Sequence, residues 1–338
     1  MSVDVVIGAQ FGSEGKGKIC AYLGVVGDYT GAIRTGGPNA AHTVIQDNRR
    51  YVFRHIPSAS VNRSLELVIG PGSHLRPDVL TDEIRDAGDL GIAHRLSIDR
   101  LAGIITPDHI RRNAILRTPT TGQGTSLAIA DRALRNLTCV RDVPLPHGTV
   151  VDVARWLAPR LSRENFLLEG TQGFGLGFYQ DWYPRSTSRD ISVAALLSEG
   201  ALPRDCVRDV YGVFRTFPIR TTDGESDLGA GETSWKSISR LAGATNPIVE
   251  RGTLDGTVRR VARFSKLLTE RFILLNRPTF ACLTFVDYLD VRARGVTKLD
   301  ELPGRARRFI DFIEDSFELR VGLISTGPGT FDTVDLRQ

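Results

Sequence analysis

Near its N-terminus the chain reads GAQFGSEGKGK, from Gly8 to Lys18. An apolar run at residues 3–7 precedes this stretch, and an apolar segment at residues 19–23 follows it. Glycines let backbone amides approach a phosphate closely, and the N-terminus of a helix favours an anion. The stretch therefore predicts a strand, a phosphate-binding loop and a helix, in that order.

The spacing of this loop is that of a variant phosphate-loop motif. Residues 12–18 fit the pattern G-x-x-x-x-G-K, but Ile19 stands where the motif has the serine or threonine that binds magnesium. Taken alone, the stretch also fits a glycine-rich turn with two solvated lysines.

The rest of the chain alternates short apolar runs with amphipathic helical segments, which predicts an α/β fold with a mostly parallel central sheet flanked by helices. Further strands are expected at residues 66–69, 165–168, 207–214, 280–286 and 319–324, and helices at residues 77–87 and 306–317. Several of these strands end at glycine-rich turns, where open α/β sheets bind their ligands. We find no internal repeat or long linker, so we interpret residues 1–338 as one catalytic domain with long loops around the sheet.

Net charge, apolar runs and cysteine spacing indicate which classes of function this chain is not expected to have. The net charge of +4 suits anionic substrates, while the arginine pairs are dispersed, so nucleic acid is not expected as the main ligand. No run of eighteen apolar residues is present, so no membrane span is expected. The four cysteines are scattered without metal-ligand spacing, which indicates reduced thiols and a cytoplasmic location.

The stretch from Gly8 to Lys18 resembles the signature G-x-Q-[WF]-G-D-E-G-K-G-K of adenylosuccinate synthetases. Later segments resemble further motifs of that family in the same order. They are GGPNAAHT at residues 36–43, IPS at 56–58, IGPG at 69–72, TTGQG at 120–124, DRALR at 131–135, EGTQG at 169–173, YPRSTS at 183–188 and STGP at 325–328. The resemblance covers nearly the whole chain and implies the family's phosphate-loop-like α/β fold.

The resemblance implies a carbon–nitrogen ligase. In this family the terminal phosphoryl group of a nucleoside triphosphate goes to the purine 6-oxygen, and the amine of L-aspartate then displaces that phosphate at carbon 6. His42 matches the general acid, Lys16 lies in the phosphate loop, and Ser13 occupies the third catalytic position. Magnesium (Mg2+) would neutralise the phosphoryl group in flight.

The resemblance also assigns binding residues. For the triphosphate they are Ser13, Glu14, Gly15, Lys16, Gly17, Lys18, Thr43, Asp287, Ser325 and Gly327. For the purine monophosphate they are Ser13, Asn39, Thr121, Arg135, Gln172 and Thr187. For aspartate they are Thr253, Gly256, Thr257 and Arg259, and for the metal they are Ser13 and the backbone carbonyl of Ala41. Arg135 matches an arginine that reaches the neighbouring subunit's site, which implies a homodimer.

Ser13 replaces the family's catalytic aspartate, which takes a proton from ring nitrogen 1 of inosinate and binds magnesium. A serine hydroxyl is a poor base and a weak ligand for a hard cation near pH 7. It leaves room for the 2-amino group of a guanine and can accept its hydrogen bond. The change resembles the viral branch, which converts dGMP to 2-amino-2′-deoxyadenylosuccinate for diaminopurine DNA and would act in the host cytoplasm.

A second departure concerns the triphosphate donor. The family's guanine-reading motif T-K-x-D is Thr284-Phe285-Val286-Asp287 here, so the lysine that covers the guanine base is absent. This difference favours ATP over GTP. The leading hypothesis is thus ligation of aspartate to dGMP with ATP.

Three alternatives stay open from the sequence. One is an ordinary adenylosuccinate synthetase that uses IMP, aspartate and GTP with a rearranged proton acceptor. Another is a catalytically inactive nucleotide-binding regulator, and the last is a nucleic-acid-binding protein.

Overall fold

The computed structural model describes residues 2–115, 121–220, 228–252 and 256–337. A ten-stranded sheet crosses it in the order β17-β16-β15-β11-β1-β10-β2-β5-β7-β9. Neighbouring strands are parallel except for β17, which is antiparallel to β16. The strands are β1 Val3–Gly8, β2 Gly31–Arg34, β5 Glu66–Ile69, β7 Leu96–Asp99, β9 Thr149–Val151, β10 Phe166–Gly173, β11 Val207–Arg215, β15 Phe280–Thr284, β16 Val321–Ser325 and β17 Thr333–Asp335.

Smaller sheets and nine helices surround this sheet in the described part of the chain. The short strands are β3 His42–Gln46 with β4 Arg49–Phe53, β6 His74–Leu75 with β8 Gly103–Ile104, and β12 Ile219–Arg220 with β13 Glu232–Thr233 and β14 Arg260–Ala262. The helices are α1 Lys16–Val26, α2 Pro77–Asp86, α3 Pro107–Ala114, α4 Thr125–Ala133, α5 Val153–Leu157, α6 Val193–Glu199, α7 Trp235–Ala242, α8 Lys266–Asn276 and α9 Gly304–Phe317. None of the described helices is long and apolar enough to cross a membrane.

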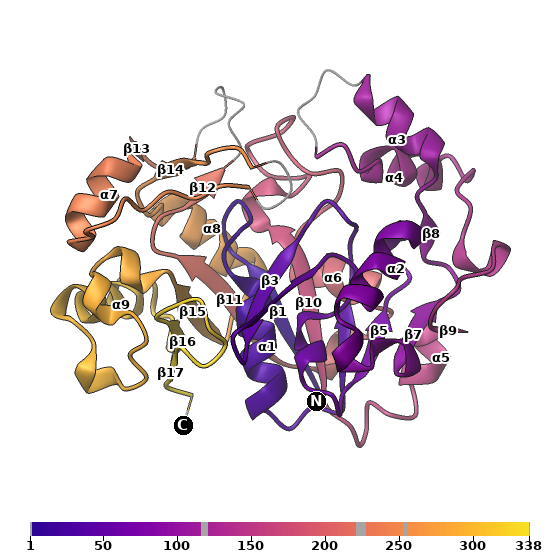
Figure 1. The fold of residues 1–338 in the computed structure, drawn as a ribbon, viewed down its shortest axis with the longest axis horizontal. Coiled ribbons are helices and arrows are strands. Elements are labelled where there is room, and N and C mark those ends of the chain that lie inside the picture. The colour runs from indigo at the N-terminus through magenta and orange to yellow at the C-terminus, as the bar shows by residue number, and fades with distance from the viewer. Residues whose placement is uncertain (1, 116–120, 221–227, 253–255, 338) are drawn as a thin grey trace.

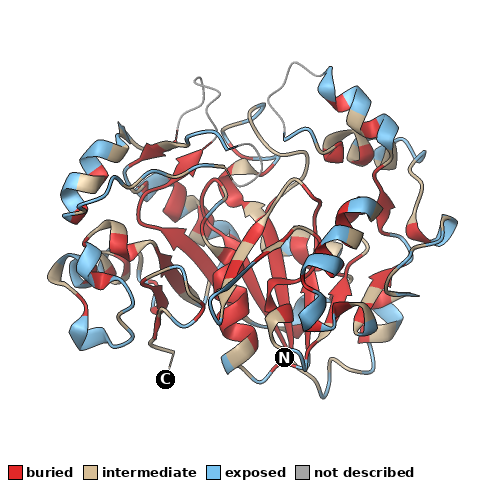
Figure 2. Cartoon of the chain, viewed as in Figure 1, coloured by how far each residue is buried: buried red, intermediate tan, exposed pale blue. Residues whose placement is uncertain are grey.

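The core has two halves because successive side chains of a strand point to opposite faces of the sheet. Val5 and Ile7 of β1 pack into one apolar cluster, whereas Val6 packs into the other. Phe166 and Leu167 of β10 divide in the same way. Figure 2 shows the resulting buried strands in the middle of the molecule, with exposed surface mainly on the outer helices.

The carboxyl ends of the parallel strands meet at one edge of the sheet. In Figure 1 the chain begins at the lower edge, and α3, α4, α7 and the β12–β13–β14 sheet lie beyond the opposite edge. The loops that follow β1, β2, β10, β11, β15 and β16 therefore surround a common region. The prediction of a mostly parallel α/β sheet flanked by helices is confirmed, and ligand binding by the loops at this edge stays a prediction.

Several boundaries differ from the sequence-based expectation, for example that of β10, which runs to Gly173 rather than to residue 168. Two of the differences concern turns of the backbone at the ligand edge. Helix α1 begins at Lys16 rather than after Lys18, because Gly15 takes a left-handed conformation (φ 89°) and ends the loop there. Strand β15 ends at Thr284, since Phe285 is also left-handed (φ 58°) and residues Val286–Tyr288 form a 3₁₀ turn. Both changes place motif residues on tightly turned backbone at the ligand edge.

Candidate active site

The loop after β1 folds around the carboxylate of Glu14. One carboxylate oxygen accepts hydrogen bonds from the backbone amides of Gln10 (3.1 Å) and Gly12 (2.8 Å). The other forms a buried ion pair with Lys16 Nζ at 2.6 Å. A buried carboxylate is stable only with such partners, so Glu14 holds the loop's shape.

Two glycines from separate motifs make room for this carboxylate. A Cβ atom at Gly8 would lie 2.5 Å from Glu14 Oε2, and one at Gly173 would lie 2.3 Å from Glu14 Oε1. The Gly173 position would also meet the backbone nitrogen of Gly12 at 2.3 Å. The glycines that end β1 and β10 are therefore required by close approach to the loop.

A buried arginine supports the loop from behind. Arg215, at the end of β11, is fully buried, and one of its NH groups donates to the backbone carbonyl of Ser13 at 3.0 Å. Its guanidinium lies 4.0 Å from the ring centroid of Phe285 and 3.5 Å from Glu250. Burial lowers the pKa of Arg215, and the nearby Glu250 carboxylate opposes that effect. This contact fixes Ser13, which has a left-handed backbone (φ 57°).

Lys18 connects the loop to the last strand of the parallel sheet. Its ammonium donates to Ser325 Oγ (2.7 Å) and to the backbone carbonyls of Gly327 (2.7 Å) and Asp332 (2.5 Å). Burial lowers its pKa to about 7, although Asp332 and Asp287 favour the charged form. Lys18 thus holds the STGP turn, and a direct contact with phosphate stays a prediction.

A cavity opens above the phosphate loop and gathers every residue predicted for the triphosphate and the metal. Its walls contain Ser13, Glu14, Gly15, Lys16, Gly17, Lys18, Ala41, Thr43, Asp287, Ser325 and Gly327 from that set, together with His42, the predicted general acid. Thr284 and Phe285 of the motif that is predicted to face the donor base also line it. Residues that the sequence did not place there are Ile45, Glu250, Arg251, Tyr288, Arg294 and Pro328. The structure therefore brings together motifs that are separated by more than 300 residues in the chain.

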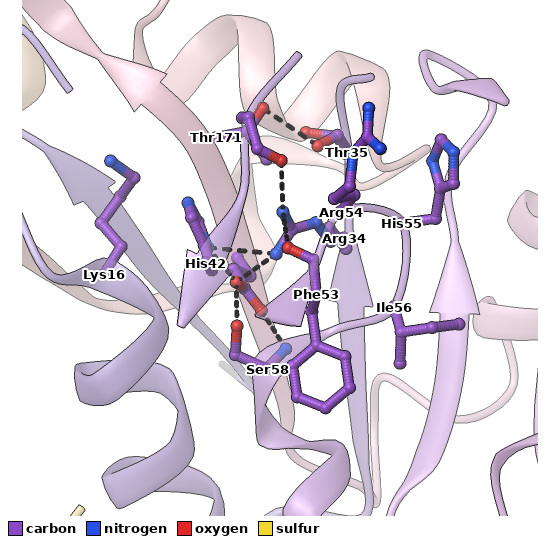
Figure 3. Close-up of polar contacts among 12 residues, drawn as sticks. Lys16, Arg34, Thr35, His42, Phe53, Arg54, His55, Ile56, Ser58 and Thr171 are labelled. Atoms are coloured by element: carbon purple, nitrogen blue, oxygen red, sulfur yellow. Dashed lines mark hydrogen bonds and ion pairs between the residues drawn. The ribbon is translucent and has the colours of Figure 1, made fainter. Parts of the chain in front are cut away.

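His42, the first residue of β3, lies at the inner wall of this cavity. It packs closely on α1, where a Cβ atom at Gly17 would lie 2.7 Å from that of His42. Its Nδ1 contacts a carboxylate oxygen of Glu169 on β10. Figure 3 shows the side chains of His42, Arg34 and Ser58 around this contact. The same oxygen accepts from Arg34 at 2.5 Å and from Ser58 Oγ at 2.6 Å. All four residues are buried.

The charges in this cluster fix the ring of His42. Burial alone would raise the pKa of Glu169, but Arg34 and the hydrogen bonds from His42 and Ser58 hold it well below its usual value. Burial and the nearby Arg34 lower the pKa of His42. A neutral His42 therefore donates Nδ1–H to an ionised Glu169, which turns Nε2 away from that carboxylate. Because a guanidinium only donates, the 3.0 Å approach of Arg34 to Nδ1 is a hydrogen bond only for the other tautomer.

The residues predicted to bind the purine monophosphate lie, apart from Ser13, on other loops at the same edge of the sheet. None of these five residues lines the cavity. Asn39 follows β2, and Gln172 is left-handed (φ 66°) near the end of β10. Thr187 donates its backbone N–H to Leu176 at 2.7 Å. Thr121 accepts from Gln123 at 3.1 Å through its carbonyl, and Arg135 is exposed just after α4.

The predicted aspartate-binding segment is described in part. Thr253 lies outside the described residues. Gly256 is left-handed (φ 66°), and its carbonyl accepts from Arg251 at 3.1 Å. Arg259 donates to Thr257 Oγ1 at 3.1 Å, so these two side chains lie together. Arg251 lines the cavity and connects this segment to it.

Sequence comparison assigns the chain to a family. Residues 5–148 match the family model of adenylosuccinate synthetase. The chain is 34% identical over 340 residues to adenylosuccinate synthetase of Thermococcus onnurineus, with 98% of each chain covered. It is 35% identical over 349 residues to that of Methanocaldococcus jannaschii, with 100% of this chain and 97% of the relative covered.

The chain belongs to the adenylosuccinate synthetase family. It is a carbon–nitrogen ligase of the type that joins aspartate to a purine nucleotide. The solved adenylosuccinate synthetase of Plasmodium falciparum has the same fold, with a TM-score of 0.88, 18% identity, and coverage of 99% of this chain and 100% of that one. The succinoaminodeoxyadenylate synthetase of cyanophage S-2L, solved with dGMP and dATP as an energy donor, gives a TM-score of 0.83 at 25% identity, with 99% and 95% covered.

Sequence reasoning missed several residues that organise the site. Arg34 and Arg215 lie in no matched motif, while Ser58 and Glu169 lie in the IPS and EGTQG motifs but received no role. A charged residue at the end of an otherwise apolar strand was the available signal, because such residues are rarely buried without partners.

Proposed function

We propose that this member of the family joins L-aspartate to carbon 6 of dGMP and uses ATP as the phosphoryl donor. The terminal phosphoryl group of ATP goes to the purine 6-oxygen, and the aspartate amine then displaces phosphate. The products are 2-amino-2′-deoxyadenylosuccinate, ADP and phosphate. On this proposal residues 1–338 act as one catalytic unit of the viral branch.

The observation that carries the choice of dGMP is Ser13. Its side chain stands where the family has aspartate, on a wall that is otherwise equipped with Lys16, His42 and Glu14. A hydroxyl is shorter than a carboxylate, carries no charge, and accepts a hydrogen bond from the 2-amino group. Because Arg215 fixes the Ser13 backbone, this change is held in a defined place. The likeness to the cyanophage enzyme solved with dGMP supports the proposal.

His42 would act as the general acid. Glu169 orients the ring, and the negative charge of the bound phosphates would raise the low pKa of His42 until Nε2 carries a proton. A proton at Nε2 could then be donated toward the purine 6-oxygen. The buried Glu169 also disfavours a catalytically inactive regulator, because an inactive relative needs no buried group that orients the imidazole.

The residues of the cavity fit magnesium held mainly by phosphates and water. Ser13 and Ala41 both line the cavity, and no group of three or more histidine, cysteine or acidic side chains that could hold a metal ion occurs among the described residues. Magnesium characteristically keeps several waters and takes few protein ligands. The Ser13 hydroxyl and the Ala41 carbonyl would hold the ion, which would neutralise charge on the phosphates.

The choice of ATP rests on Phe285 and Arg294. Phe285 offers an aromatic face in the cavity, which can stack on either purine without reading its edge. Asp287 forms an ion pair with Arg294 at 3.4 Å, so its carboxylate is partly engaged before any guanine could be read. Neither residue therefore favours a guanine over an adenine base in the donor triphosphate.

We further propose a homodimer in which Arg135 reaches the partner's monophosphate site. Arg135 is exposed after α4, beside Leu134, which is 66% exposed. Sedimentation should give a dimer. Mixing inactive Arg135→Ala with inactive His42→Ala protein should restore activity in heterodimers that contain one intact site, whereas no restoration contradicts a shared site.

The second candidate is ordinary adenylosuccinate synthesis from IMP, which the archaeal relatives favour. Ser13→Asp separates the two, with Ser13→Ala as the matched control. If dGMP is the substrate, Ser13→Asp should lose dGMP turnover and gain none with IMP. A gain in IMP turnover would favour the second candidate.

A further inference from the structure

Arg189 contacts strand β10 and helix α6 beside Gln172 of the predicted monophosphate site. Its Nε donates to Gln172 Oε1 at 3.3 Å, and its NH2 group contacts both the hydroxyl and the carbonyl of Thr171. Its remaining NH group forms an ion pair with Glu199 at the end of α6. The Arg189 side chain is only 9% exposed, so these contacts are largely shielded from water.

Glycines of two further motifs pack against this arginine and its partners. At Gly36 (φ 106°) a Cβ atom would lie 2.1 Å from Thr171 Oγ1 and 3.0 Å from Arg189. At Gly70 and Gly72 a Cβ atom would lie 2.4 Å from backbone and side-chain atoms of Glu199. The GGPN and IGPG motifs therefore enclose the Arg189–Glu199 pair, a role distinct from contact with substrate.

The contact with Arg189 determines which end of the Gln172 amide is free. A guanidinium only donates, so the amide oxygen of Gln172 faces Arg189 and its NH2 group faces away. Gln172 is half-buried and makes no other side-chain hydrogen bond within the described residues. Its left-handed backbone is uncommon for glutamine, which indicates that the surroundings impose this geometry.

We propose that Arg189 is a positioning and specificity-determining residue. By holding the oxygen of Gln172, it presents the amide NH2 to the purine as a hydrogen-bond donor. The site thereby selects purines with an acceptor at the 6-position or at N7, and disfavours 6-amino purines. The inference rests on the proposed function in one respect, namely that Gln172 lies beside the base.

Arg189 also couples the base to the phosphate end of the same ligand. Its backbone carbonyl accepts from Phe178 at 3.0 Å, and Thr187, the predicted phosphate contact, lies two residues earlier. The side chain thus ties the loop that carries Thr187 to the strand that carries Gln172. Loss of Arg189 should weaken binding of the monophosphate while leaving the ATP cavity intact.

A double-mutant cycle tests this proposal by calorimetric binding of dGMP and of IMP to the full-length protein. Arg189→Met should weaken the preferred monophosphate roughly tenfold or more, as expected for loss of a charge-assisted contact. In a Gln172→Ala background the same change should have almost no further effect, since coupled residues are not additive. Arg189→Lys keeps the charge beside Glu199 without the planar fork, so it should resemble Arg189→Met while keeping the wild-type Tm.

Arg271→Met is the matched control, because Arg271 donates from Nε to Gln180 at 2.8 Å in the same way, and neither of these two residues belongs to a predicted substrate site. It should leave both affinities unchanged. Additive losses in the cycle, or equal weakening of ATP by Arg189→Lys, would overturn the inference. If the proposed function is wrong, the wild-type protein will show no turnover. The double-mutant binding cycle would still decide the role of Arg189, because it measures binding alone.

Discussion

Replacing Glu169 by glutamine removes the counter-charge from the buried guanidinium of Arg34. Arg34 is 2% exposed and Glu169 is 1% exposed, and their closest atoms lie 2.5 Å apart. Breaking such a pair from one side costs about 3–5 kcal/mol because a charge is left buried without a partner. Since glutamine keeps the volume and can still accept one hydrogen bond, we expect a loss of about 3 kcal/mol in the free energy of unfolding.

The same change should impair His42. The amide oxygen would take the place of Oε1, which accepts from Arg34, His42 and Ser58 Oγ, and the NH2 group would face the backbone N–H of Ser58. The carboxylate charge that favours a protonated His42 would be gone, so the ring would be held less firmly and protonated less readily. Loss of a positioned acid lowers rates by roughly 10²–10⁴-fold, and we expect kcat to fall at least 100-fold at pH 7. Urea unfolding and phosphate release would be measured together. Glu164→Gln is the control, because Glu164 is partly exposed and pairs with Arg160 at 3.6 Å, and losing such a solvent-accessible pair costs about 1 kcal/mol or less. Wild-type stability and turnover in Glu169→Gln would refute the reasoning.

Three further predictions concern other parts of the site. Gly173→Ala should weaken ATP binding at least tenfold by calorimetry, because its Cβ atom would meet Glu14 and the backbone of Gly12 at 2.3 Å; equal affinity would show that the loop does not depend on this approach. His74 is buried, and neither of its ring nitrogens has a hydrogen-bond partner within the described structure. Burial lowers its pKa to about 3. Below pH 6.5 the unfolded chain therefore binds a proton at His74 that the folded chain does not bind. Stability should therefore fall from pH 6.5 toward pH 3, by about 2 kcal/mol at pH 5 from this group, and urea unfolding of His74→Leu should show a correspondingly smaller fall. Phe285→Lys should lower KM for GTP relative to ATP, and an unchanged ratio would exclude Phe285 from donor selection.

The main sheet and the phosphate loop were predictable because local pattern dictates them. An apolar run, a glycine-rich stretch and a helix must place the loop at the carboxyl edge of a parallel sheet, and β1 with α1 does so. The set of motif residues that line the cavity was also predictable from the resemblance. The short strands β12, β13 and β14 were not, because two or three residues carry no periodicity.

The supporting charges could not be predicted from the sequence. Arg34 and Glu169 are 135 residues apart, and only the pairing of β2 with β10 brings them to one place. Arg215 reaches Ser13 from a strand that begins some 190 residues later, and no local pattern encodes that contact. For Lys18 the sequence did not indicate the protein partners that the structure shows. Its motif indicated a phosphate ligand, whereas in the fold its ammonium donates to three protein acceptors at the end of β16 and in the turn that follows.

On our proposal, Ser13 adapts an aspartate-joining ligase to a 2-amino purine. The most direct measurement is phosphate release by the purified protein with magnesium, L-aspartate and ATP, comparing dGMP with IMP under the same conditions. We predict turnover with dGMP, dependent on aspartate, and none with IMP. Turnover with IMP alone would contradict the claim and would identify an ordinary adenylosuccinate synthetase whose proton acceptor is a group other than Ser13.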